Sequence, residues 1–231
     1  MISKLAKNGT ALIMLNLFAS ALNYFCQLLM GRMLTVEGFG TINSIFSFLV
    51  MVGVPGATLT AITAKHVAES VALFQTKKLS DFFTKVIYLA TLLAVGIVAV
   101  CSVGLLIFSK SLGIVSGGIL IIAAVLAGVS YYIPVISGML SGINKFVILG
   151  MFSLVIPVFK TLGVAISAQA NHNDSLQISI ILITIILGTL FAILAGFIPL
   201  YKNGIKLQFN AKSIRNISTG ITQNHILSFL I

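Results

Sequence analysis

Six long apolar runs limit what this chain can fold into. Each run exceeds 20 residues, and in order they cover residues 10–31, 39–64, 83–108, 117–140, 147–169 and 177–201. About 20 apolar residues in a helix cross the roughly 30 Å hydrocarbon core of a bilayer. Of all 231 residues, 58% are apolar and 8% are charged, which leaves too little polar material to coat a soluble domain. The sequence therefore predicts an all-α, polytopic transmembrane helical bundle, and it excludes a soluble enzyme and a secreted disulfide domain.

The connections divide the chain into three parts. Residues 1–201 are expected to form an N-terminal six-helix transmembrane bundle, 202–220 a cytoplasmic basic linker, and 221–231 the start of a seventh span. The longest connection before residue 200 is 65–82, in which apolar residues recur at helical spacing. This segment is predicted to be either a short interfacial helix or an extension of the second span.

Basic residues lie unevenly on the two sides of the predicted spans. With the N-terminus inside, the inside segments hold eleven Lys and Arg residues, and the outside segments hold Arg32 and Lys110. Because basic residues accumulate on the cytoplasmic side, this distribution predicts a multi-pass protein of the cell membrane with a cytoplasmic N-terminus. The net charge of +10 is then a topology signal. Without a basic face carrying interleaved aromatic residues, it indicates no nucleic-acid partner.

The sequence contains no motif of a soluble enzyme. It lacks the G-x-x-x-x-G-K-[ST] loop that cradles phosphates and the H-E-x-x-H zinc motif, and its three histidines are far apart. We therefore expect neither enzymatic activity nor a cofactor or a metal ion.

A polar stripe runs along the first span. Its members are spaced four, three and four residues apart, which places them on one helical face: Asn16, Ser20, Asn23 and Gln27. Facing lipid, their unsatisfied polar groups would cost several kcal/mol. The stripe is therefore expected to face other helices or water, either as interhelical hydrogen bonds or as the wall of a cavity.

Lys160 is a cation about two-thirds of the way along the fifth span, on a face shared with Ser153 and Ser167. A lysine at the helix centre costs about 2.5–3.5 kcal/mol on insertion scales. The two alternatives are a side chain that snorkels to the interface and one that faces a hydrated cavity, and the distance to the span ends favours the cavity. No carboxylate lies inside a span, because the acidic residues fall in loops or at span edges: Glu37, Glu69, Asp81 and Asp174.

Prolines interrupt several spans, and small residues recur at helical spacing in one of them. Each of the four prolines removes a helix hydrogen bond, and all lie within spans: Pro55, Pro134, Pro157 and Pro199. The strongest predicted break is Gly53-Val54-Pro55-Gly56 in the second span. Small residues at helical spacing predict close helix packing in the fourth span: Ser137, Gly138, Ser141 and Gly142.

The segment that follows the first span resembles a known family. Residues 31–40, GRMLTVEGFG, are similar to the R-x-L-x-P-x-x-F-G stretch of bacterial polysaccharide and lipid-linked oligosaccharide flippases. Residues 41–48 and 63–69 continue in the same style, although Val36 stands where the family often has proline. These flippases belong to the multidrug/oligosaccharidyl-lipid/polysaccharide exporter superfamily.

The resemblance implies one lobe of a two-lobe transporter. In that family two six-helix bundles surround a central cavity, and alternating access flips a lipid diphosphate-linked sugar. If the cavity-lining positions of the family are carried over to this sequence, the residues on or near the cavity wall would be Asn23, Gln27, Arg32 and Asn43. Arg32 would pair either with a phosphate or with Glu37. The implied partners are membrane lipid, an anionic lipid-linked saccharide and a C-terminal helical bundle that the 231 residues do not include.

Two other functions stay open at this point. One is a cation-coupled multidrug exporter of the same superfamily, which the lack of carboxylates within the spans disfavours. The other is a non-transporting membrane scaffold or remnant.

The predicted topology can be tested by cysteine-accessibility labelling in intact cells. We expect cysteines placed at residues 170–176 to react with a membrane-impermeant reagent and those at 202–220 to be protected, because the basic segments should stay inside. External reactivity at 202–220, or protection at 170–176, would contradict the predicted topology.

Overall fold

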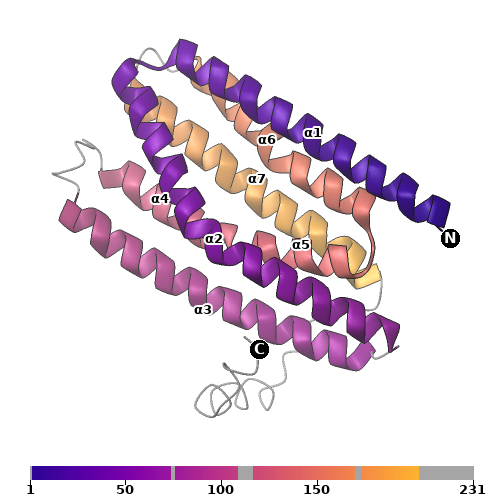
Figure 1. Ribbon diagram of the computed structural model, residues 1–231. Helices are drawn as coiled ribbons and strands as arrows, with labels where there is room; N and C mark the ends of the chain where they lie inside the picture. The colour runs from indigo at the N-terminus through magenta and orange to yellow at the C-terminus, as the bar shows by residue number, and fades with distance from the viewer. Residues whose placement is uncertain (1, 74–75, 109–116, 170–172, 203–231) are drawn as a thin grey trace.

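The computed structural model describes residues 2–73, 76–108, 117–169 and 173–202. Within these ranges every secondary-structure element is a helix (Figure 1): α1 (Ile2–Met33), α2 (Val36–Ala72), α3 (Thr76–Phe108), α4 (Gly117–Ser130), α5 (Tyr132–Gly142), α6 (Phe146–Ser167) and α7 (Asp174–Lys202). Helices α4 and α5 follow each other closely and together form one apolar segment. The described chain therefore contains six helical segments long and apolar enough to cross a membrane, which confirms the predicted all-α polytopic bundle.

The ends of α2 and α3 differ from the predicted spans. Helix α2 continues to Ala72 and α3 begins at Thr76, so the predicted connection 65–82 is mostly helical and extends the second span. With 37 residues, α2 is about 55 Å long at 1.5 Å per residue, which exceeds the roughly 30 Å hydrocarbon core. The predicted linker 202–220 and the seventh span at 221–231 lie outside the described residues, apart from Lys202 at the end of α7.

A short, well-capped turn joins α1 to α2. Thr35 is the N-cap of α2, and its hydroxyl accepts a hydrogen bond of 3.2 Å from the Gly38 N–H. The same hydroxyl donates to the carboxylate of Asp174, which lies in the first turn of α7. Asp174 therefore ties the α1–α2 turn to the start of α7, close to the N-termini of both helices, where a negative charge is stabilising.

Consecutive helices α1 and α2 diverge from this turn (Figure 1). Helix α1 packs along α6, and α6 in turn packs along α7. Helix α2 packs along α5, and α3 packs along α4. Because α1 and α2 share few contacts, an opening forms between them.

The buried apolar residues form two separate cores. The first core lies toward the α1–α2 turn and is built by α1, α2, α4, α6 and α7: Cys26, Met30, Leu34, Ile42, Ile45, Ile119, Ala123, Leu126, Val164, Ile178, Ile181, Leu182 and Ile185. The second core lies toward the α2–α3 connection and is built by α2, α3, α5, α6 and α7: Val67, Leu79, Phe83, Ala90, Val135, Ile136, Met139, Leu140, Phe152, Ala192 and Leu200. The bundle thus consists of two packed layers stacked along the helices.

Glycines allow α5 to approach α2 closely, as the small-residue spacing predicts. A Cβ atom at Gly138 would lie 2.7 Å from the Cβ of Thr63. A Cβ atom at Gly142 would lie 2.6 Å from the Cβ of Val67 and 2.9 Å from the backbone oxygen of Ala64. Distances below 3.0 Å leave no room for a methyl group, so the contact requires glycine.

We expect Gly142→Ala to lower the free energy of unfolding by about 1–3 kcal/mol, because overpacking forces neighbouring atoms apart. The matched control is Gly96→Ala in α3, where a Cβ atom would meet nothing within 4 Å. The control should stay within about 1 kcal/mol of the wild type. Thermal unfolding in detergent, followed by circular dichroism, measures both, and equal melting temperatures would contradict the close α2–α5 contact.

Candidate functional site

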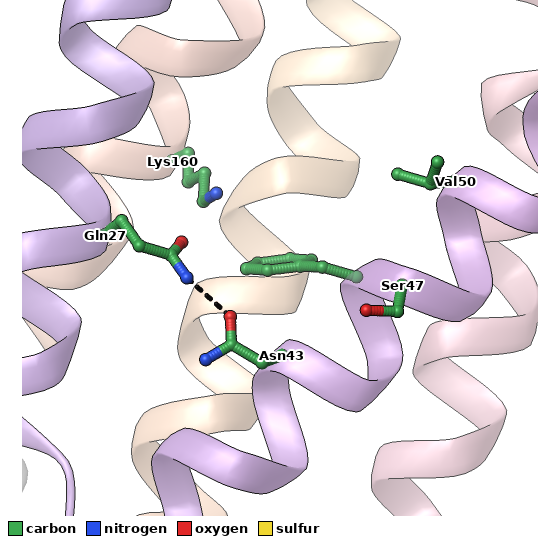
Figure 2. A pocket seen from close by; sticks show the side chains of 6 residues that line it. Gln27, Asn43, Ser47, Val50 and Lys160 are labelled. Atoms are coloured by element: carbon green, nitrogen blue, oxygen red, sulfur yellow. Dashed lines mark hydrogen bonds between the residues drawn. The ribbon is translucent and has the colours of Figure 1, made fainter.

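A pocket lies in the opening between α1 and α2 (Figure 2). It has a volume of about 380 Å³ and is lined by Gln27, Asn43, Phe46, Ser47, Val50 and Lys160. One lining residue comes from α1, one from α6 and four from α2. The volume falls within the range of about 300–1,000 Å³ found for small-molecule sites.

Two amide side chains bridge α1 and α2 at this pocket. The Gln27 side-chain N–H donates to Asn43 Oδ1 at 2.6 Å, as Figure 2 shows. Each amide carries both a carbonyl oxygen and an NH₂ group. Among the described residues, the Gln27 oxygen and the Asn43 nitrogen make no further hydrogen bond, so both can bind a polar ligand.

Lys160 brings a positive charge to the same pocket. It is half-buried, and its Nζ lies 4.1 Å from the centre of the Phe46 ring. A cation over an aromatic face is stabilised by the ring quadrupole, by up to about 2 kcal/mol when desolvated. Within the described ranges no carboxylate forms an ion pair with Lys160, and the acidic residues lie near helix ends: Glu37, Glu69, Asp81 and Asp174.

The polar stripe of α1 divides into separate contacts. Asn16 Oδ1 accepts a hydrogen bond of 2.7 Å from Ser153 of α6, and the Ser20 hydroxyl donates to the Asn16 backbone oxygen at 3.0 Å. Asn23 is exposed and has no hydrogen-bond partner in the described part of the chain. The stripe therefore has no single role. Asn16 bonds to a neighbouring helix, Asn23 is exposed, and Gln27 lines the pocket.

Arg32 lies apart from this group. It is exposed in the last turn of α1, where a cation is favourable at the helix C-terminus, and it does not line the pocket. No ion pair links it to Glu37, although both residues are described. Of the residues singled out from the sequence, the pocket brings together Gln27, Asn43 and Lys160.

Phe46 is a pocket residue that the sequence reasoning missed. Asn43, Phe46, Ser47 and Val50 recur at the spacing of one helical face, so the face itself was readable from the sequence. The contact between Phe46 and Lys160 joins two residues more than 100 positions apart in sequence, and helical periodicity within one span carries no information about it.

Known proteins do not identify the site. No protein-family model, curated protein or solved structure matches the chain. The described residues include no group of three or more His, Cys, Asp or Glu side chains that could hold a metal ion. What the pocket offers is one cation, two amides with free polar atoms and a serine hydroxyl, a set suited to an anionic ligand with additional hydrogen-bonding groups.

The amide bridge is expected to contribute to the stability of the bundle. In a double-mutant cycle with Gln27→Ala and Asn43→Ala, we expect a coupling free energy of about 0.5–1.5 kcal/mol, because each single change removes the same hydrogen bond. Reversible unfolding in mixed detergent measures it. A parallel cycle with Asn23→Ala and Asn43→Ala should give a value near zero, and equal coupling in both cycles would argue against the bridge.

Proposed function

We propose that this protein is a membrane transporter that flips or exports an anionic, lipid-linked saccharide by alternating access. It is proposed to work together with a second helical bundle that completes the transport path. The observation that carries the proposal is Lys160, a cation within a span that lines an open pocket and pairs with an aromatic ring rather than with an acid.

The charge balance of the pocket supports an anionic substrate. A cation within the hydrocarbon region is costly unless it faces water or meets a negative group, and no described residue supplies that group to Lys160. A lysine binds phosphate as a point charge. A bound diphosphate would therefore replace the weaker contact with the Phe46 ring.

The surroundings of the pocket support an amphiphilic substrate. Large apolar side chains are exposed on both helices that flank the pocket, among them Tyr24 and Leu28 on α1 and Val54 and the pocket-lining Val50 on α2. The lysine, amide and serine groups of the pocket thus lie between apolar surfaces that suit lipid chains. A substrate with a charged, hydroxyl-rich head and an apolar tail matches both surfaces.

The cation-coupled alternative has less support. Proton or cation binding within a membrane uses a carboxylate in the span, and all four acidic residues of the chain lie near helix ends. The function proposed here therefore rests on charge complementarity between Lys160 and a phosphate group.

The role of Lys160 can be tested by saccharide export from cells that depend on this protein, with its amount checked by immunoblot. We expect Lys160→Ala to reduce export about tenfold to a hundredfold, because a charge-assisted contact contributes about 1.5–3 kcal/mol and each 1.4 kcal/mol is about tenfold. Lys160→Arg should keep part of the activity.

Two control variants make this result specific. Lys145→Ala changes an exposed lysine at the start of α6 and should export normally. Lys160→Met keeps an unbranched apolar stem against Phe46 but removes the charge, so it should fail like Lys160→Ala. Normal export by the methionine variant would mean that Lys160 acts through packing alone and would refute the anion-binding role.

A further inference from the structure

In α2 and in the α4–α5 segment, the boundary between the two cores coincides with an interruption of the helix. In α2 the first core and the side chains packed against it end at Leu49, and the second core begins at Val67. Pro55 lies between these two residues. In the α4–α5 segment the first core ends at Leu126 and the packing of the second begins at Tyr132, so the interruption at Tyr131 lies at the same boundary.

Helix α2 bends in its middle (Figure 1), which is where Pro55 lies in the sequence. A proline inside a helix removes one backbone hydrogen bond, and its ring displaces the preceding turn. The outer side of this turn is poorly covered, since Met51 is 75% exposed and Val54 is 66% exposed. On this outer side, no other described helix covers the bend of α2.

The bend of α2 and the interruption between α4 and α5 are in direct contact. The Tyr131 hydroxyl donates to the backbone oxygen of Val52, in the turn that precedes Pro55. On the other side of the bend, the Thr60 hydroxyl shares its proton between the Gly56 backbone oxygen at 3.0 Å and the Pro134 backbone oxygen at 3.2 Å. A Cβ atom at Gly56 would lie 2.8 Å from Pro134 Cγ, so the proline of α5 fits against a position where α2 has no side chain.

Helix α1 differs from α2 in this respect. It contains no proline and packs along α6. Of the six side chains that line the pocket, Gln27 and Lys160 belong to the α1–α6 pair, and the other four lie on α2 before Pro55. All six therefore lie on the first-core side of the bend, and a change of angle at Pro55 moves the part of α2 from Gly56 onward relative to α1.

We propose that α2 and the α4–α5 segment form a coupled hinge at the boundary between the cores, and that Tyr131 is the positioning residue that sets its angle. The Tyr131 hydroxyl holds the turn before Pro55 against the α4–α5 break. Loss of this bond frees α2 to bend to other angles and changes the opening between α1 and α2. The hinge is independent of what the pocket binds, so its test uses no substrate.

The hinge can be tested by distance measurements between spin labels on the full chain in lipid nanodiscs, with Cys26 and Cys101 replaced by alanine. Labels at Ile13 on α1 and Lys65 on α2, both exposed, report the opening. A change of about 20° at the bend, acting over the ten residues from Pro55 to Lys65 (about 15 Å), moves Lys65 by about 5 Å. We expect Tyr131→Phe to shift or broaden the Ile13–Lys65 distances by about this amount.

A second label pair and a matched variant distinguish a hinge motion from a general loss of packing in the bundle. Labels at Lys65 and Asn144 lie on α2 and at the end of α5, on the same side of the bend, and their distance should not change. Tyr132→Phe removes the neighbouring hydroxyl, which donates to Thr91 of α3 at 2.9 Å, and should leave both distances unchanged. Equal effects of Tyr131→Phe and Tyr132→Phe, or equal changes in both label pairs, would overturn the proposal.

Pro55→Ala tests the hinge without altering Tyr131. Restoring the missing N–H should straighten α2 and give a narrower Ile13–Lys65 distribution at a different mean distance. An unchanged distribution in this variant would overturn the hinge even if Tyr131→Phe could not be purified.

Discussion

Inside a bilayer every polar group has to find a partner within the protein, because the hydrocarbon offers none. Many serine and threonine hydroxyls of the described helices meet this demand within their own helix. Thr41, Thr91 and Thr189, for example, each donate to the backbone oxygen four residues earlier. Amides have a donor and an acceptor at one end of the side chain, and one helix turn seldom satisfies both. Asn16 and Gln27 accordingly reach to α6 and α2, and these bonds mark where α1 meets its neighbours.

One buried amide of the described chain does not follow this pattern. Gln177, in the first turns of α7, is 3% exposed, and its Oε1 has no hydrogen-bond partner among the described residues. The carboxylate of Asp174, one turn earlier, is bonded to Thr35. The polar groups at the start of α7 are therefore divided between a satisfied carboxylate that holds the α1–α2 turn and a buried amide oxygen that is not satisfied.

The number and type of the spans were predictable because they depend on local properties. A run of 20 apolar residues with few charges has to be a helix in lipid, whatever surrounds it. The ends of the helices were less predictable. The residues around Glu69 and Asp81 are polar enough to read as a loop, yet α2 and α3 continue through them. The short α1–α2 turn depends partly on the contact between Thr35 and Asp174, which are 139 residues apart, and no local pattern contains that contact.

The candidate site was predictable only in part, for the same reason. Polar residues in apolar spans drew attention to Gln27 and Lys160, and the resemblance added Asn43. The sequence placed Asn16 and Gln27 on one face, but the structure gives them different partners because α1 lies along α6 and has few contacts with α2. The ring of Phe46 under Lys160 follows from where α2 and α6 lie within the bundle, which is a property of the whole fold.

The packing of α1 against α6 also has a consequence for how the protein is made. Helix α6 begins 113 residues after α1 ends, so at synthesis rates of about 5–20 residues per second α1 waits roughly 6–23 s for its main partner. During this interval Asn16 lacks Ser153. The first helix to leave the ribosome is thus among the last to be fully packed, and until then its amides depend on the insertion machinery or on water at the membrane surface for their hydrogen bonds.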